Sequence, residues 1–398
     1  MSLADARVRL GIASATLALA ATAVLVIAGW PGRSYLDSDY LQYYAGSRAL
    51  IEGASPYDHT WWAEFHQRVG SRALSSPPHT GDANDDWTTP YPLPTFIALI
   101  PFALLPLALA EPLFATSQVA LLLGAMLALA AVVPRSLSTP GAVRADRIFL
   151  IAITAASQPL WVLLAGGNAT GFAVAAFTFA LAALLVGRSW LSGLLVAGIL
   201  IKPHLFVLGA LALFVGAPVA LRARLAAGAA IGTLALVLPA FVLQPGWVGD
   251  WLRQAGTLQA SSFSNATGWT IARPFTAAFL VPSAVVVVAC VAALVVWWWR
   301  ARPDLLRLVA GALPVSVLVA PHGWSYDYIA LLPTLVAGVG LASGSRMRTS
   351  AFGAVALLAV LVPWLLYSVA MGRNGEDLSA PFLIVAEVAI IAAVRPRS

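Results

Sequence analysis

The chain has 398 residues, of which 60% are hydrophobic and only 10% are charged. Soluble domains carry roughly a quarter charged residues, so this composition excludes a soluble protein of this length. The excess of six positive charges comes without a basic cluster interleaved with aromatic residues, which argues against a nucleic-acid partner. Apolar runs of about 17–25 residues recur along the chain, so we expect an all-α, polytopic integral membrane protein.

The first apolar run covers residues 10–30 and follows two arginines, Arg7 and Arg9. We expect a retained span rather than a cleaved signal peptide, because no convincing small-residue cleavage site follows it. Basic residues favour the cytoplasmic side, so the N-terminus is predicted inside and the loop 30–90 outside. That loop holds eight acidic residues and four arginines, the opposite of a cytoplasmic loop.

Within the first external loop, the order from Tyr40 to Glu52 predicts a short amphipathic helix. Asp39 stands where an N-cap would be, and Gly53 follows as a stop. Carboxylates on an ordered loop beside a membrane are a site hypothesis, and a solvated loop with a capping Asp is the alternative. The acidic and aromatic candidates of this stretch are Asp39, Tyr43, Tyr44, Tyr57 and Asp58.

Residues 91–109 are interrupted by several prolines, and we expect them to re-enter the membrane rather than to cross it. Residues 113–133 are predicted to be an ordinary span. Positive charges at the ends of the later apolar runs then predict twelve crossings with both termini inside. The whole chain, 1–398, is predicted to be one membrane domain with a second external loop at 244–274. Every unusual polar cluster falls on the outer side.

Lys202-Pro203-His204 interrupts one apolar run. The proline breaks the helix and frees backbone groups, while a lysine and an imidazole beside it suit a phosphate at the membrane surface. A lysine that snorkels from a helix end is the structural alternative.

Residues 321–328 form a second polar cluster, which contains His322, Trp324, Ser325 and Asp327. Asp327 could orient His322, or it could pair with Lys202 from another helix. The structural alternative is a helix start with Ser325 as N-cap and Asp327 in the first turn. Trp324 would then belong to an interfacial aromatic belt.

Asn168 follows two glycines and is either an N-cap or a substrate contact. Aromatic and amide side chains of loop 244–274 either stack on sugars or anchor an interfacial helix. No Walker loop, Rossmann glycine pattern or metal-spaced His/Cys cluster occurs, so we expect neither a cofactor nor a metal. An outward-facing catalyst has no nucleotide sugar available, so its sugar donor would be linked to a lipid.

Six motifs follow one another along the chain: Asp39-Tyr40-x-x-Tyr43-Tyr44-x-Gly46, Gly53-x-x-Pro56-Tyr57-Asp58, Tyr91-Pro92, Gly167-Asn168, Lys202-Pro203-His204 and Pro321-His322-x-x-x-x-Asp327. In their order and spacing these motifs resemble those of glycosyltransferase family 87. The family consists of membrane enzymes of GT-C type that use polyprenyl-phosphate-mannose. The chain departs from the pattern at Gly166-Gly167-Asn168, where a Gln often precedes the Asn, and this leaves that contact open.

The resemblance implies inverting mannose transfer to a glycolipid acceptor at the outer face of the plasma membrane. It implies Asp58 as catalytic base, with Asp39 as the second candidate, and Lys202 and His204 as the grip on the donor phosphate. His322 would bind the phosphate or assist the base, with Asp327 setting its tautomer. Substrate-supporting residues would be Tyr43, Tyr44, Tyr57, Asn168 and Trp324. A transporter or lipid flippase, or an enzyme transferring another sugar such as arabinose, stays open as an alternative.

Overall fold

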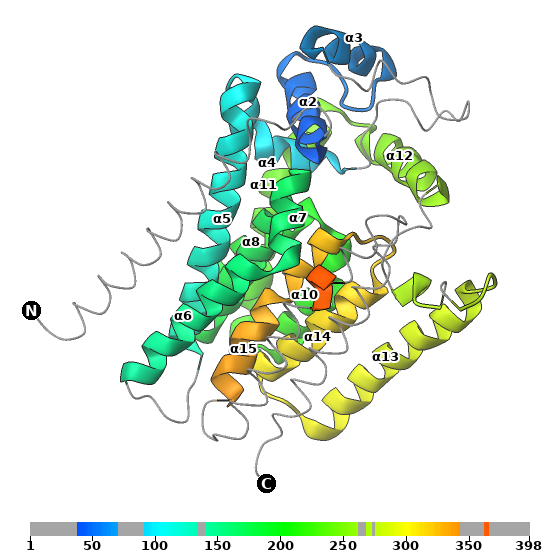
Figure 1. Ribbon diagram of the computed structural model, residues 1–398. Helices are drawn as coiled ribbons and strands as arrows, with labels where there is room; N and C mark the ends of the chain where they lie inside the picture. The colour runs from blue at the N-terminus through cyan, green and yellow to red at the C-terminus, as the bar shows by residue number, and fades with distance from the viewer. Residues whose placement is uncertain are drawn as a thin grey trace, which may run out of the picture.

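The computed structural model describes residues 38–70, 91–133, 140–261, 268–272, 275–342 and 362–365 (Figure 1). All regular elements among these residues are helices. The expected first span 10–30, the segment 75–90 and the expected last span 379–394 lie outside the described residues. Of the expected span 350–371, only residues 362–365 are described.

Two short helices form the described part of the first loop. Helix α2 (Asp39–Ile51) lies within one residue of the helix predicted from Tyr40 to Glu52, and Gly53 follows it with a φ of 73°. The expected amphipathic character is wrong, because α2 is buried on nearly all sides. The expected N-cap role of Asp39 is wrong, because Ser38 is the N-cap and Asp39 is the first helical residue. Short amphipathic helices were expected in this loop, and the second of them, α3 (His59–Val69), is one whose bounds the sequence pattern did not predict. Asp58 is its N-cap, and the Asp58 side chain accepts a hydrogen bond from the Thr60 backbone N–H.

The proline-rich segment forms a short helix followed by a long one. Helix α4 (Leu93–Ala103) has 11 residues and starts after Pro92, and α5 (Leu107–Val132) has 26 residues and starts after Pro106. At 1.5 Å per residue α4 measures about 16 Å, short of the roughly 30 Å of a bilayer core. The length of α4 therefore agrees with a segment that does not cross, whereas α5 begins six residues before the predicted span.

Three of the described helices are long and apolar enough to cross a membrane, namely α5, α11 (Val219–Leu243) and α13 (Leu280–Ala301). The expected number of twelve crossings therefore exceeds what helix length supports over the described residues. The other helices in the first two thirds are α6 (Pro140–Ala156), α7 (Gln158–Gly166), α8 (Thr170–Leu185), α9 (Ser189–Val196), α10 (Val207–Gly216) and α12 (Trp247–Ser261). They are followed by α14 (Leu305–Val319) and α15 (Leu332–Ala342).

Short 3₁₀ helices interrupt the apolar runs at two polar clusters. Between α9 and α10 the chain passes through η4 (Ala197–Ile201) and η5 (Pro203–Leu205), and Lys202 between them has left the helical conformation, with φ −145° and ψ 70°. The predicted break at Lys202-Pro203 is thus confirmed. The second interruption is η7 (Ser325–Leu331), which leads into α15, and a further 3₁₀ turn, η6 (Gly268–Thr270), precedes α13.

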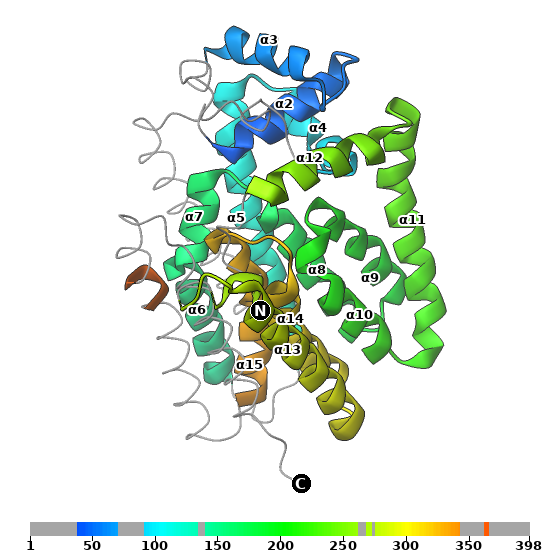
Figure 2. The ribbon, with the colours of Figure 1, turned by 90° about the vertical axis from the view of Figure 1, so that its right-hand side faces the viewer.

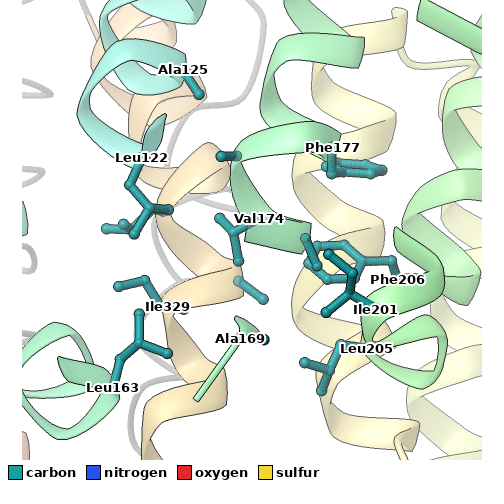
Figure 3. Packing of buried hydrophobic residues seen from close by; sticks show 14 of the residues in the cluster. Leu122, Ala125, Leu163, Ala169, Val174, Phe177, Ile201, Leu205, Phe206 and Ile329 are labelled. Carbon is teal, nitrogen blue, oxygen red and sulfur yellow. The ribbon is translucent and has the colours of Figure 1, made fainter. Parts of the chain in front are cut away.

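Helix α8 is buried on nearly all sides and packs against α5, α9, η4 and η7. A helix that is apolar all round belongs to the interior of a bundle. Figure 3 shows Val174 of α8 between Leu122 of α5 and Phe206 near η5, with Phe177 of α8 beside Phe206. Helices α2, α3 and α12 gather at one end of the bundle, as both views show (Figures 1 and 2). The start of α8 and the two broken runs therefore bring polar groups together inside an apolar body.

Candidate functional site

A partly exposed carboxylate from α2 is held by donors from two distant segments. Asn168 Nδ2 donates to Asp39 Oδ2 at 2.9 Å, and the Tyr326 hydroxyl donates to the same oxygen at 3.2 Å. Asn168 lies in the turn between α7 and α8, and Tyr326 lies in η7. Two donors from separate elements fix the orientation of the carboxylate, and they leave its other oxygen, Oδ1, available to a ligand's donor.

Asn168 connects this carboxylate to the start of α8. Its side chain is fully buried, and Nδ2 also donates to the Tyr91 hydroxyl at 3.2 Å. Its Oδ1 accepts the Thr170 backbone N–H at 3.1 Å, which satisfies one of the free donors at the helix start. Ala169 is the N-cap by backbone conformation, yet the Asn168 side chain does the capping. Of the two roles that the sequence left open, the structure shows the cap, and it adds a contact with Asp39; a contact with substrate stays a prediction.

Lys202 and Asp327 form a buried ion pair beside the Asn168 cluster. Lys202 Nζ lies 2.8 Å from Asp327 Oδ1, and the two side chains are 3% and 1% exposed. Thr170 Oγ1 donates to the same oxygen at 2.6 Å, and the Trp324 backbone N–H donates to Oδ2 at 3.1 Å. Burying two charges is costly unless they are paired and further hydrogen-bonded, and this pair meets both conditions. Of the two predicted roles for Asp327, pairing with Lys202 is the one that the structure shows.

Tyr326 joins the two clusters into one network. Its hydroxyl donates to Asp39, while Lys202 Nζ lies 4.7 Å from the centre of its ring. Burial raises the pKa of Asp39 above its ordinary value, and the hydrogen bond from Asn168 and the charge of Lys202 offset only part of this shift. A carboxylate with a raised pKa, held near a cation, is a stronger base than an exposed one.

His204 and His322 lie at the edge of the network, with ring centres 6.4 Å apart. Trp324 Nε1 donates to His322 Nε2 at 2.8 Å, so the proton of the neutral ring is on Nδ1. The expectation that Asp327 sets this tautomer is therefore wrong, because Trp324 sets it. Burial and the charge of Lys202 lower the pKa of His322 to about 4, so the ring is neutral near pH 7.

The remaining predicted residues occupy different places. Asp58 is exposed, and its carboxylate caps α3 through Thr60 N at 2.8 Å. The Tyr57 hydroxyl donates to the Tyr91 carbonyl at 2.8 Å, and the ring of Tyr43 packs on that of Tyr91 at 4.3 Å. Tyr43 and Tyr57 thus support Tyr91 beside Asn168. Tyr44 points away from the network and donates to the Leu105 carbonyl.

The turn before Asn168 requires a glycine. Gly167 has a φ of +68°, which L side chains rarely adopt, and a Cβ there would come 2.7 Å from Tyr40 Cβ. The α7–α8 turn can therefore lie directly against the first turn of α2. This close approach brings Asn168 within reach of Asp39.

In the predicted external loop 244–274, the described residues 244–261 and 268–272 make several contacts with the rest of the protein. Trp247 of α12 is 6% exposed, and Trp269 Nε1 donates to the Val319 carbonyl at 2.9 Å. Ser55 Oγ donates to Gln244 Oε1 at 3.0 Å, which ties the segment before α12 to the loop after α2. Of the two sequence interpretations, these contacts support the anchoring of an interfacial helix.

Sequence reasoning did not single out Tyr91, Thr170 and Tyr326 as site residues. Each lies within or next to a motif that the sequence did mark: Tyr91 precedes Pro92, Thr170 follows Asn168 by two positions, and Tyr326 stands between Trp324 and Asp327. Among the described residues, no group of three or more His, Cys, Asp or Glu side chains is placed to hold a metal ion.

Comparison with known families identifies the class of enzyme. Residues 87–321, more than half of the chain, match the model of glycosyltransferase family 87. The chain belongs to glycosyltransferase family 87. The matched region of this family-87 protein contains Tyr91, Asn168, Lys202 and His204, whereas Asp39 lies before it and Asp327 after it. No curated protein matches the chain in sequence.

Family membership and apolar helices together describe a membrane-embedded glycosyltransferase. A glycosyltransferase needs a group that accepts the proton of the attacking hydroxyl and groups that stabilise the departing one. The network of this family-87 protein contains a partly exposed carboxylate, Asp39, next to a buried cation, Lys202. It is the candidate active site.

Proposed function

We propose that this glycosyltransferase transfers mannose from polyprenyl-phosphate-mannose to a glycolipid acceptor at the outer face of the plasma membrane. The observation that carries the proposal is the network joining Asp39, through Tyr326, to the Lys202–Asp327 pair in a family-87 chain. It combines a base for the acceptor with positive charge for a lipid phosphate. The order of the sequence motifs, which resembles polyprenyl-phosphate-mannose enzymes, supports mannose as the sugar.

The reaction is a single displacement with inversion. The acceptor hydroxyl loses its proton to a carboxylate, and its oxygen forms the new bond to the anomeric carbon of mannose. The bond from that carbon to the phosphate oxygen breaks on the opposite face, and its electron pair leaves with the lipid phosphate. A β-linked mannosyl phosphate becomes an α-mannoside. No cofactor is needed for these atoms and charges to balance.

We assign the base to Asp39 rather than to Asp58. Asp39 is oriented by Asn168 and Tyr326, and its pKa is raised. Asp58 is exposed and already has a structural role as the cap of α3. General bases work best when their pKa approaches the working pH, which favours the carboxylate with the raised pKa, Asp39.

Lys202 and His204 are proposed to stabilise the departing phosphate. Lys202 contributes its charge from within the buried pair. His204 Nε2 is buried and has no hydrogen-bond partner among the described residues, so a phosphate oxygen could satisfy it. His322, neutral and carrying its proton on Nδ1, would add a hydrogen bond rather than a charge.

For the acceptor we propose a phosphatidylinositol mannoside that gains an α-1,2-linked mannose. The support is the resemblance of the motif order to the mycobacterial phosphatidylinositol mannoside mannosyltransferase PimE. A high proportion of Ala and Val, and the use of Arg at 22 of the 23 basic positions, also suit an actinobacterial chain.

The test is transfer by the purified full-length protein. It is incubated with radiolabelled polyprenyl-phosphate-mannose and a membrane lipid extract, and the lipid products are separated. A parallel reaction contains polyprenyl-phosphate-arabinose, and a third follows movement of labelled lipid across vesicles without any acceptor. Label in a new glycolipid from the mannose donor alone supports the proposal. Label from the arabinose donor alone, or lipid movement without a product, contradicts it.

A further inference from the structure

A groove lies away from the candidate active site, between the last turn of α2, the end of α3 and the turn joining α4 to α5. Its volume is about 400 Å³. Arg48, Glu52 and Arg68, from α2 and α3, form what we call its charged bank, and Leu104, Leu105 and Leu107, from the α4–α5 turn, form its apolar bank. Tyr44, Phe65 and Val69 also line the groove.

The charged bank holds two cations and one anion. Arg48 Nη2 lies 3.1 Å from Glu52 Oε1, and Arg68 Nη2 lies 3.0 Å from Glu52 Oε2. Trp61 Nε1 donates to Glu52 as well, at 3.2 Å. Burial raises the pKa of Glu52, but the hydrogen bonds from Arg68, Trp61 and Arg48 outweigh it and leave the pKa below its ordinary value. Glu52 is therefore ionised, and the bank keeps one uncompensated positive charge.

Both arginines are held in place while remaining accessible. Their side chains are 33% (Arg48) and 51% (Arg68) exposed. Arg48 Nη1 also donates to the Ala103 carbonyl at 3.4 Å, and the guanidinium of Arg68 lies 5.5 Å from the ring centre of Phe65. Guanidinium groups that are already positioned lose little entropy on binding, and their planar donors fit the oxygens of a phosphate.

Leucines are exposed both in the groove and beyond it, at the start of a membrane helix. Leu104, Leu109 and Leu113 are 64%, 57% and 48% exposed. The latter two belong to α5, which is long and apolar enough to cross a membrane. An exposed apolar strip on such a helix is a surface for hydrocarbon chains.

We propose that the groove binds the phosphate group of an anionic membrane phospholipid, with an acyl chain lying along Leu104, Leu109 and Leu113. The phosphate group would bind the arginines near the end of the membrane helix α5, and the acyl chain would contact the exposed leucines. Free phosphate would use only the arginines, and it has no need of the leucine strip. The site is distinct from the Asp39 network and does not rest on the proposed transfer reaction.

The test measures lipid binding to the purified full-length protein in detergent, without any sugar donor. The probes are fluorescent phosphatidylglycerol and phosphatidylcholine with the same chains. We expect the wild type to prefer phosphatidylglycerol, and Arg48→Gln with Arg68→Gln to weaken its binding about tenfold or more, as loss of charge-assisted hydrogen bonds implies. Arg253→Gln is the matched control, because Arg253 is an exposed arginine paired with Asp250 on α12. It should bind phosphatidylglycerol like the wild type.

Leu104→Glu is a second variant that leaves the arginines and Glu52 intact. Leu104 is exposed, so the substitution should fold, and a negative charge beside the phosphate should weaken phosphatidylglycerol binding. This variant decides the question if the double arginine variant does not fold. Unchanged binding in the variants that fold, equal loss in Arg253→Gln, or displacement of the lipid by equimolar inorganic phosphate would overturn the proposal.

Discussion

Lys202 and Asp327 are 125 positions apart in the chain, yet Lys202 Nζ lies 2.8 Å from Asp327 Oδ1 in an almost fully buried pair. Each stands where an apolar run gives way to 3₁₀ structure, Lys202 between η4 and η5 and Asp327 within η7. The broken helices thus supply two charges that stabilise each other inside the protein.

Removing one charge of this pair should destabilise the protein. Lys202→Met leaves Asp327 buried without its cation, a change that costs about 3–5 kcal/mol in comparable pairs. The double variant Lys202→Met with Asp327→Asn should recover part of that loss, because neither charge then needs a partner. Thermal unfolding of the purified variants measures both effects. Mannose transfer should stay low in both, and a double variant with wild-type turnover would exclude a role for Lys202 at the phosphate.

Asp39→Asn should abolish sugar transfer. The amide keeps the shape of the side chain but cannot accept a proton from the acceptor, so turnover should fall about 100-fold or more. Asp58→Asn is the matched control and should retain most of the activity, because Asp58 only caps α3. An asparagine is also a good N-cap. Loss of transfer in Asp58→Asn, with activity retained in Asp39→Asn, would instead assign the role of base to Asp58.

The activity should depend on pH through Asp39. Burial raises the pKa of this carboxyl from its ordinary value of 3.8, and only the ionised form accepts a proton. As the pH falls, kcat/KM should therefore start to decline above the range in which an exposed aspartate titrates. The acidic limb measured between pH 4 and 8 checks this. If kcat/KM declined only at or below the pH range in which an exposed aspartate titrates, the raised pKa of Asp39 would be contradicted.

Gly167→Ala should impair both stability and transfer. A methyl group there would come 2.7 Å from Tyr40 Cβ in a backbone with positive φ, so the α7–α8 turn and α2 would have to separate. Separation moves Asn168 away from Asp39. Gly187→Ala is the control, since Gly187 also has a positive φ but meets no atom within 4 Å. It should lower the melting temperature with little effect on transfer, and equal losses of transfer in both variants would refute this explanation.

Transfer should survive a chelator. Side chains are proposed to neutralise the lipid phosphate, so a divalent metal is not needed for that purpose. Activity is compared with and without EDTA at fixed pH. Loss of turnover that manganese restores would count against the phosphate role of Lys202 and His204.

Local sequence signals located the breaks and the ends of helices. Pro203 removes a helical donor, and Gly53 supplies a positive φ, so the break near Lys202 and the end of α2 follow from single residues. Proline spacing likewise limited the length of α4. The identity of the Lys202 partner was one of two open alternatives, because pairing across helices depends on how those helices pack.

The partners of Asp39 could not be predicted in this way. Asn168 and Tyr326 are 129 and 287 positions away, and no local periodicity relates residues at such distances. Asp58 attracted the role of base because it ends the tyrosine-rich motif, but the motif gave no sign that α3 begins at the next residue. The sequence thus predicted which segments are polar. The packing of α2 against the α7–α8 turn determines that Asp39 is the carboxylate in contact with Asn168.

Helix α2 bears Asp39 in its first turn and Arg48 in its last, with a buried face between them. Nine residues at 1.5 Å each separate the two along the axis by about 13 Å. The interval is rigid, since tightly packed Tyr40, Tyr43 and Ala45 prevent the helix from bending. The lipid phosphate proposed at Arg48 would therefore stay at a fixed distance from Asp39, so that binding in the groove would leave the carboxylate in place.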